Sequence, residues 1–230
     1  MPNAEETDAW LKQVFTAPST SSLADSYNSW SARYEADMLA VGYMHPLVAA
    51  GMVGRHVVER DGGILDAGVG TGLLGQVLAV MGYHGLVGID MAEGMLTQAR
   101  SRNVYTRLSR QVLGEPLDFA DDSFAAVVSI GTLNIGHAPP AALDELVRVT
   151  RPGGHLILTI PVRAWEQGGF GEKVEALARD SRWRLVEATE PYRPMPLSPA
   201  EGATTTRMLV YRSVSRLARR PRLAAIGHAF

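Results

Sequence analysis

Cysteine is absent from the 230 residues, and lysine occurs only twice, as Lys12 and Lys173. The lack of cysteine excludes disulfides, thiolate metal ligands and a cysteine nucleophile. No apolar run is long enough to span a bilayer, and the N-terminus is acidic and polar, unlike a signal peptide. A formal net charge of -2 gives no reason to expect nucleic acid or a membrane surface as a partner. These features predict a cytoplasmic protein.

The length suits one α/β domain with a sizeable core, because 46% of the residues are hydrophobic and 20% are charged. We expect a helical cap or lid over residues 1–45 and the main domain over residues 46–213. Four arginines gather in the remaining stretch, 214–230, which we expect to be a solvated basic tail. They are Arg216, Arg219, Arg220 and Arg222.

Short apolar strands alternate with helical patterns along the main domain, which predicts right-handed βαβ units. The last two strands lack a helix between them and are expected to pair as an antiparallel hairpin. The fold class is therefore α/β, with a Rossmann-like, seven-stranded, mostly parallel sheet, an antiparallel last strand and helices on both faces. The expected strands cover 64–67, 84–90, 109–113, 123–131, 155–161, 183–190 and 205–213. Residues 152–154 are expected to form a turn, and residues 19–26, "STSSLADS", a loop.

The stretch "ILDAGVGTGLLG" carries two overlapping glycine patterns after the first strand. One is D-x-G-x-G-x-G, typical of a methyl-donor site, and the other is G-x-G-x-x-G, typical of a dinucleotide site. Glycines at a strand-to-helix turn let backbone N–H groups approach a ligand, and Asp90, which ends the next strand, can accept hydrogen bonds from ribose hydroxyls. Asp66 favours the methyl donor, because a carboxylate repels pyrophosphate and attracts an ammonium group. Gly75 then has a packing role.

The alternative interpretation of the same loop is the dinucleotide site of a nicotinamide-dependent oxidoreductase. Single-domain dehydrogenases of the short-chain type need a Tyr-x-x-x-Lys pair, and neither lysine lies four residues after a tyrosine. A binding module without catalysis is a second alternative.

Four segments resemble class I S-adenosylmethionine-dependent methyltransferases, in order and spacing, from about residue 27 to 161. They are "LDAGVGTG", "GIDMAEGMLTQAR", "LDFADDSFAAVVSIGTL" and "ELVRVTRPGGHLILTIP". Within that class the chain resembles the Williams–Beuren syndrome region methyltransferase-like group, through "YNSWSARYEADM", "GMLTQAR" and "VYTRLSRQVLGEPL". The resemblance implies S-adenosyl-L-methionine as cofactor and a class I methyltransferase domain over 46–213. It implies no established acceptor.

The resemblance also assigns roles around the cofactor. The methionyl part would lie against the glycine loop and the end of the fourth strand, and the adenosine against the ends of the second and third. Leu113 stands where many members carry an acid, so we expect that contact to be made by backbone. The implied cofactor residues are Asp66, Gly68, Gly70, Gly72, Asp90, Met91, Leu113, Gly114, Ser129 and Ile130, joined by Tyr27 and Tyr34 from the N-terminal segment.

Transfer to an oxygen or nitrogen atom of a small-molecule acceptor is the predicted reaction. His137 is a candidate general base, because it lies in the loop after the fourth strand and its ordinary pKa suits that role. His45 is a weaker candidate. The N-terminal segment and residues 163–204 are expected to line the acceptor pocket. No metal motif such as H-E-x-x-H is present, so we expect no metal.

Overall fold

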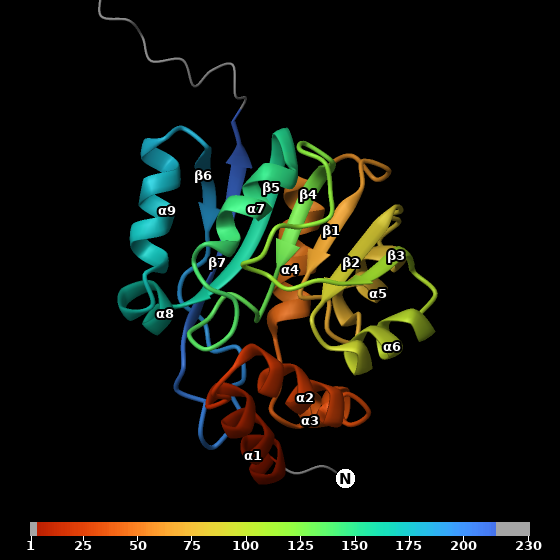
Figure 1. Cartoon of the computed structure of the whole chain (residues 1–230), viewed down its shortest axis with the longest axis vertical. Helices are drawn as coiled ribbons and strands as arrows, with labels where there is room; N and C mark the ends of the chain where they lie inside the picture. The colour runs from red at the N-terminus through yellow and green to blue at the C-terminus, as the bar shows by residue number, and fades with distance from the viewer. Residues whose placement is uncertain (1–3, 215–230) are drawn as a thin grey trace, which may run out of the picture.

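The computed structural model describes residues 4–214, which form one seven-stranded sheet surrounded by helices (Figure 1). The strands are β1 (Ile64–Ala67), β2 (Leu86–Asp90), β3 (Tyr105–Arg110), β4 (Phe124–Ser129), β5 (Thr150–Pro161), β6 (Trp183–Ala188) and β7 (Thr206–Ser213). The helices are α1 (Ala4–Phe15), α2 (Thr20–Trp30), α3 (Tyr34–Ala40), α4 (His45–His56), α5 (Leu73–Val80), α6 (Glu93–Ser101), α7 (Ala142–Val149), α8 (Val162–Gln167) and α9 (Phe170–Arg179).

The sheet has the order β3-β2-β1-β4-β5-β7-β6, with β3 and β6 at its two edges. The pairs among β1 to β5 are parallel, and β7 runs antiparallel to both of its neighbours. The order reverses between β1 and β4, which places a topological switch point beside the glycine loop. The predicted α/β fold is confirmed, including the antiparallel last strand.

Alternate residues of the central strands feed two separate hydrophobic clusters, one on each face of the sheet. Ile64 of β1 belongs to the cluster that holds Val53 of α4, whereas Leu65 belongs to the cluster that holds Leu146 of α7. All four residues of β1 are buried. Burial on both faces is the condition under which parallel strands are apolar throughout. The parallel pairing of β1 with β2 and β4 places the carboxyl ends of these strands side by side.

Three local predictions were wrong. The third strand occupies Tyr105–Arg110 rather than 109–113. It lies at the edge of the sheet, and its polar, half-exposed residues give no apolar pattern that would predict a strand there. The segment 19–26 begins α2, because Ser19 caps that helix and forms a capping box with Ser22. Residues 152–154 lie within β5, where the register with β4 shifts, instead of forming a separate turn.

The first three helices pack together at one end of the sheet (Figure 1). They share a small core that includes Leu11, Trp30 and Met38 and reaches Met195 from the segment after β6. The indole N–H of Trp30 donates to the fully buried carboxylate of Asp37 at 2.7 Å. This core holds α1, α2 and α3 over the ends of the strands.

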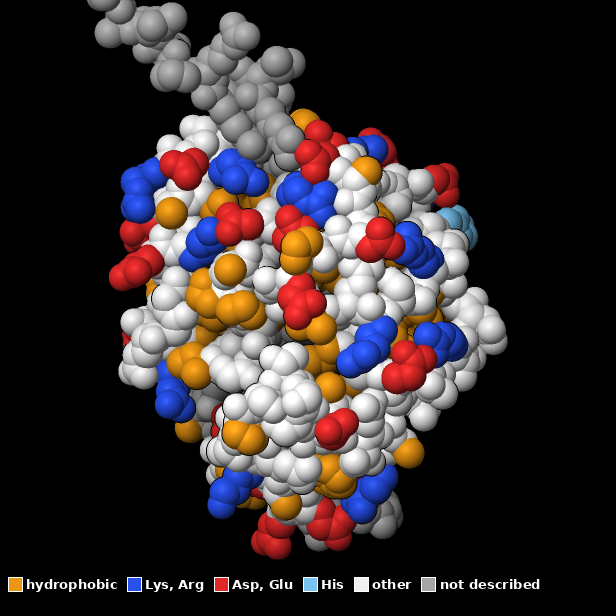
Figure 2. All heavy atoms as spheres, viewed as in Figure 1, with side chains coloured by type: hydrophobic (Ala, Val, Ile, Leu, Met, Phe, Trp, Pro, Cys, Tyr) orange, Lys and Arg blue, Asp and Glu red, His pale blue; other side chains and the backbone are white. Residues whose placement is uncertain are grey.

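Within residues 4–214, no single helix has the length and apolar character needed to cross a membrane, although α3 and α4 taken together, bent by 92°, do. Acidic and basic side chains are interspersed on the face shown in Figure 2. The predicted basic tail lies outside the described residues, apart from Val214.

Candidate active site

The loop between β1 and α5 is built from glycines in left-handed backbone conformations. Gly68, Gly70 and Gly72 have φ values of 86°, 53° and 82°. The N–H groups of Gly68 and Val69 both donate to the carbonyl of Ile89 at 2.9 Å, which ties the loop to β2. A residue with a Cβ is strained in this region of φ, so the chain can turn here chiefly because these positions are glycine.

A cavity of about 280 Å³ lies where the loop meets the ends of β2 and β4. Ten of the residues predicted from the sequence line it, drawn from segments far apart in the chain. They are Tyr27, Tyr34, Gly68, Gly70, Asp90, Met91, Leu113, Gly114, Ile130 and His137.

Asp90 is held in place by two backbone N–H groups. Its Oδ2 accepts from Gly70 N and its Oδ1 from Ala92 N, each at 2.9 Å. Burial raises the pKa of the Asp90 carboxyl, and the backbone N–H donors partly offset that rise. The carboxylate is therefore fixed before any ligand arrives, at the place where ribose hydroxyls were expected.

Three predicted cofactor residues lie behind the wall of this cavity rather than in it. Asp66 is 3% exposed and Ser129 is fully buried, with its hydroxyl donating to the Ala67 carbonyl at 2.8 Å. Gly72 is buried at the start of α5. None of the three borders the cavity.

Tyr105 of β3 fills the space behind the loop, a role that its position in the sequence did not predict. Its hydroxyl donates to Asp66 Oδ2 at 2.8 Å. A Cβ at Gly72 would lie 3.0 Å from the Tyr105 ring, and one at Gly75 would overlap its hydroxyl. Gly75 thus has the predicted packing role, and the spacing of Gly72 and Gly75 on the first turn of α5 was the signal that a bulky side chain packs there.

The pKa of Asp66 is raised to about 7. Burial is the main cause, the charge of Asp90 adds to the rise, and the hydrogen bond from Tyr105 partly offsets it. The two aspartates are therefore not independent, although only one faces the cavity.

A group of aromatic side chains from the N-terminal helices closes the cavity on the other side. The Tyr27 hydroxyl and His137 Nε2 lie 2.9 Å apart, and the Tyr27 and Tyr34 rings meet edge to face. Burial lowers the pKa of His137 to about 4, so the imidazole is neutral at pH 7. Tyr43 also lines the cavity and was missed, because nothing in its local sequence distinguishes it.

A second cavity, of about 430 Å³, lies between the N-terminal helices and the ends of β5 and β7. It has four lining residues in common with the first cavity: Tyr27, Tyr34, Tyr43 and Gly131. Parts of 163–204 line it, including Arg163, Glu166 and Met195, and so does His45. Two adjoining cavities with a common wall can hold two reactants next to one another.

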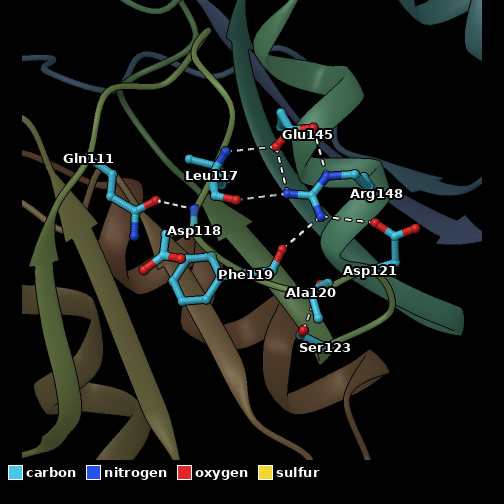
Figure 3. Close-up of polar contacts among 9 residues, drawn as sticks. All are labelled: Gln111, Leu117, Asp118, Phe119, Ala120, Asp121, Ser123, Glu145 and Arg148. Atoms are coloured by element: carbon cyan, nitrogen blue, oxygen red, sulfur yellow. Dashed lines mark hydrogen bonds and ion pairs between the residues drawn. The ribbon is translucent and has the colours of Figure 1, made fainter.

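Arg148 of α7 fixes the segment that runs from the cavity wall back to β4 (Figure 3). Its guanidinium donates to the carbonyls of Leu117 and Phe119 at 2.9 and 2.7 Å and pairs with Glu145 and Asp121. Glu145 in turn accepts from Leu117 N at 2.7 Å. The pairing raises the pKa of Arg148 and lowers that of Glu145. This network ties together two of the segments that carry the family resemblance.

No group of three or more histidine, aspartate or glutamate side chains among residues 4–214 is arranged to hold a metal ion.

The cavity fits S-adenosylmethionine. No atom lies within 4 Å of where a Cβ would stand on Gly70, so bare backbone borders the cavity there. That backbone, the fixed carboxylate of Asp90 and the aromatic wall suit a ligand with ribose hydroxyls.

Residues 65–158 match the family described as a methyltransferase domain. A similar solved structure is a TehB-like SAM-dependent methyltransferase from Corynebacterium glutamicum, with 21% identity, a TM-score of 0.60 and coverage of 82% of this chain and 99% of that one. Residues 65–158 therefore carry a methyltransferase domain, the fold is that of class I methyltransferases, and the cofactor of that class is S-adenosylmethionine.

Among curated relatives, Methyltransferase-like protein 27 of Homo sapiens is 34% identical over 157 residues, which are 67% of this chain and 64% of that protein. Phosphatidylethanolamine N-methyltransferase of Cereibacter sphaeroides is 32% identical over 130 residues, 54% of this chain and 62% of that protein. The chain thus spans less than two thirds of the length of either relative.

Proposed function

We propose that the chain transfers the methyl group of S-adenosylmethionine to an oxygen or nitrogen atom of a small-molecule acceptor. The observation that carries this proposal is the pair of cavities with Tyr27, Tyr34, Tyr43 and Gly131 in common. Both cavities are of the size that small ligands occupy. The second cavity adjoins the first at the ends of the strands, which is where an acceptor must lie to meet the methyl group.

We assign direct cofactor contacts to the nine predicted cofactor residues that line the first cavity, with Asp90 receiving the ribose hydroxyls. Asp66, Gly72 and Ser129 act on the cofactor through the loop that they support. S-adenosylmethionine supplies a methyl carbon already activated by its sulfonium. The residues of the chain have to hold the acceptor atom in line with that carbon, and such positioning contributes up to roughly 7–11 kcal/mol.

The N-terminal segment 1–45 serves in this proposal as a cap over both cavities, with the methyltransferase domain over 46–213. The narrower assignment to the Williams–Beuren syndrome region methyltransferase-like group rests on "YNSWSARYEADM" and "VYTRLSRQVLGEPL". A cytoplasmic site of action and a small-molecule partner belong to the same proposal.

Calorimetric titration with S-adenosylhomocysteine and with NAD tests the cofactor site. We expect saturable binding of the first and none of the second. Asp90→Ala should weaken S-adenosylhomocysteine by about 1–3 kcal/mol, because the ribose hydroxyls lose a charged acceptor. Asp118→Ala is the matched control, since that carboxylate is 87% exposed and pairs with Arg107.

Two outcomes would decide against the proposal. An unchanged affinity of Asp90→Ala for S-adenosylhomocysteine would show that Asp90 does not bind the ribose hydroxyls. Binding of NAD without binding of S-adenosylhomocysteine would support an oxidoreductase instead. A screen of a metabolite extract with radiolabelled S-adenosylmethionine then separates an enzyme from a binding module, because only an enzyme produces labelled metabolites.

A further inference from the structure

The second cavity is uncharged inside and charged only near its mouth. Its charged lining residues, Arg163, Glu166 and Glu201, are exposed or half-exposed. Its fully buried lining residues are all uncharged, and three of them carry polar side chains: His45, Thr159 and Thr206. An ion placed at the inner end would lose its hydration without gaining a counter-charge.

His45 is fixed in this interior by its neighbours. It begins α4 just before Pro46, is 5% exposed, and its Nδ1 lies 2.7 Å from the Tyr192 hydroxyl. The rings of Tyr43 and Tyr192 both meet the imidazole edge to face. Among the described residues Nε2 has no hydrogen-bond partner, so one ring nitrogen is engaged and the other is available to a ligand.

Thr206 provides a second polar group without a partner. Thr206 is one of the residues that line the cavity, and its Oγ1 is buried and makes no hydrogen bond with any described residue. Its backbone pairs with Tyr192 in both directions at 2.9 Å, which places it next to the residue that holds His45. The Thr159 hydroxyl, in contrast, already accepts from Gly131 N at 2.8 Å. A buried hydroxyl left without a partner is costly, and a polar ligand atom would relieve that cost.

We propose that the second cavity binds an acceptor with a neutral hydroxyl group on an apolar body, and that His45 and Thr206 hold this hydroxyl, with His45 as the catalytic residue that takes its proton. This inference rests on the proposed methyl transfer and names its acceptor atom. His45 Nε2 receives the proton while the acceptor oxygen bonds to the methyl carbon and the carbon–sulfur bond breaks. The proton then leaves to solvent. Tyr192 is a positioning residue, because it accepts from Nδ1–H and so leaves Nε2 free of hydrogen.

The electrostatics of the interior favour this assignment over an ammonium acceptor. Burial lowers the pKa of His45 to about 3, so the ring stays neutral and does not repel a sulfonium nearby. A hydroxyl becomes strongly acidic as its oxygen bonds to carbon, and a weakly basic imidazole is then sufficient. His137 is less well placed for this task, since it lines only the first cavity and its Nε2 is engaged by Tyr27.

The probes for the test are p-cresol, which is a neutral phenol, and 4-methylbenzylamine, which is an ammonium ion of similar shape. Each is titrated into the full chain saturated with S-adenosylhomocysteine, and the imidazole nitrogens are followed by 15N NMR. We expect p-cresol to bind saturably and to shift Nε2 of His45, and the amine to bind at least tenfold more weakly. His45→Gln and Thr206→Val should each weaken p-cresol by about fivefold or more. If His45→Gln does not fold, Thr206→Val still tests the proposed site.

The matched control is His56→Gln, because His56 lies on the same helix but outside both cavities and pairs with Glu187. It should leave p-cresol binding unchanged. The role of Tyr192 is tested by the tautomer of His45 in the 15N NMR spectrum. The free protein should show the Nδ1–H tautomer, and Tyr192→Phe should shift the equilibrium toward the Nε2–H tautomer. A merely structural role of Tyr192 would leave the tautomer unchanged.

Several results would overturn the inference: no saturable p-cresol binding, tighter binding of the amine, unchanged binding in both cavity variants, or an Nε2–H form of His45 in the wild type. If S-adenosylhomocysteine itself does not bind, the proposed function fails instead, and the two failures are thereby distinguished.

Discussion

Two neighbouring parallel strands end near an aspartate, and the two carboxylates have opposite surroundings. Asp90, at the end of β2, faces the first cavity and is held by backbone N–H groups of Gly70 and Ala92. Asp66, in β1, lies behind the glycine loop and is held by the hydroxyl of Tyr105. The side of the loop with Asp90 faces the cavity, and the side with Asp66 packs against the protein. The two aspartates therefore have different surroundings, although both lie beside the same loop.

The first prediction concerns the packing side and has the largest expected effect. The pKa of Asp66 is raised from 3.8 to about 7 in the folded protein, so the folded state binds a proton more tightly than the unfolded chain. The free energy of unfolding therefore falls as pH rises between about 4 and 7. Asp66→Asn cannot titrate, and its stability relative to wild type should increase across that window by up to about 4 kcal/mol. Urea unfolding at several pH values measures this difference.

Asp118→Asn serves as the control, because Asp118 is exposed and lies outside the glycine loop. The affinity of Asp66→Asn for S-adenosylhomocysteine should change less than that of Asp90→Ala. A pH-independent difference in stability, or a loss of affinity equal to that of Asp90→Ala, would place Asp66 on the ligand side of the loop.

The second prediction compares two glycines on the two sides of the same loop. An alanine at Gly75 would overlap the Tyr105 hydroxyl, and we expect it to cost about 1–3 kcal/mol of stability while the cofactor affinity is retained. An alanine at Gly70 meets no protein atom within 4 Å, and its φ of 53° costs about 1 kcal/mol. Because its methyl group would enter the first cavity, Gly70→Ala should weaken S-adenosylhomocysteine. Thermal unfolding and calorimetric titration of both variants measure the two effects. The comparison fails if Gly75→Ala is the variant that loses affinity.

The sequence was sufficient to predict the fold because the apolar strands and the helices between them are each locally encoded. It also predicted the positions of the glycine loop and of Asp90, because the glycine spacing indicates a strand-to-helix turn and Asp90 ends an apolar strand. It was not sufficient to separate Asp66 from Asp90, because the difference depends on Tyr105, which lies in an edge strand with little apolar pattern.

The second cavity was predictable only in outline. Residues 163–204 and the N-terminal segment do meet there, but the polar interior combines His45 from α4, Tyr192 from the segment after β6 and Thr206 from β7. His45 and Thr206 are more than a hundred positions apart in the sequence. The packing of α4 against β7 brings them together. No local pattern marks such a site.

The third prediction extends the comparison to two tyrosine hydroxyls and has the smallest expected effect. Tyr105→Phe removes the hydrogen bond to a buried carboxyl group behind the loop, whereas Tyr27→Phe removes one to the neutral ring of His137 in front of it. We expect Tyr27→Phe to cost about 0.5–1.5 kcal/mol of stability, as is usual for a neutral hydrogen bond, and to weaken S-adenosylhomocysteine slightly through a less ordered wall. Tyr105→Phe should cost more stability, because it leaves Asp66 without a donor, and should spare the affinity. Chemical denaturation and titration of both variants test this, and equal effects on affinity would mean that the two sides of the loop do not act independently.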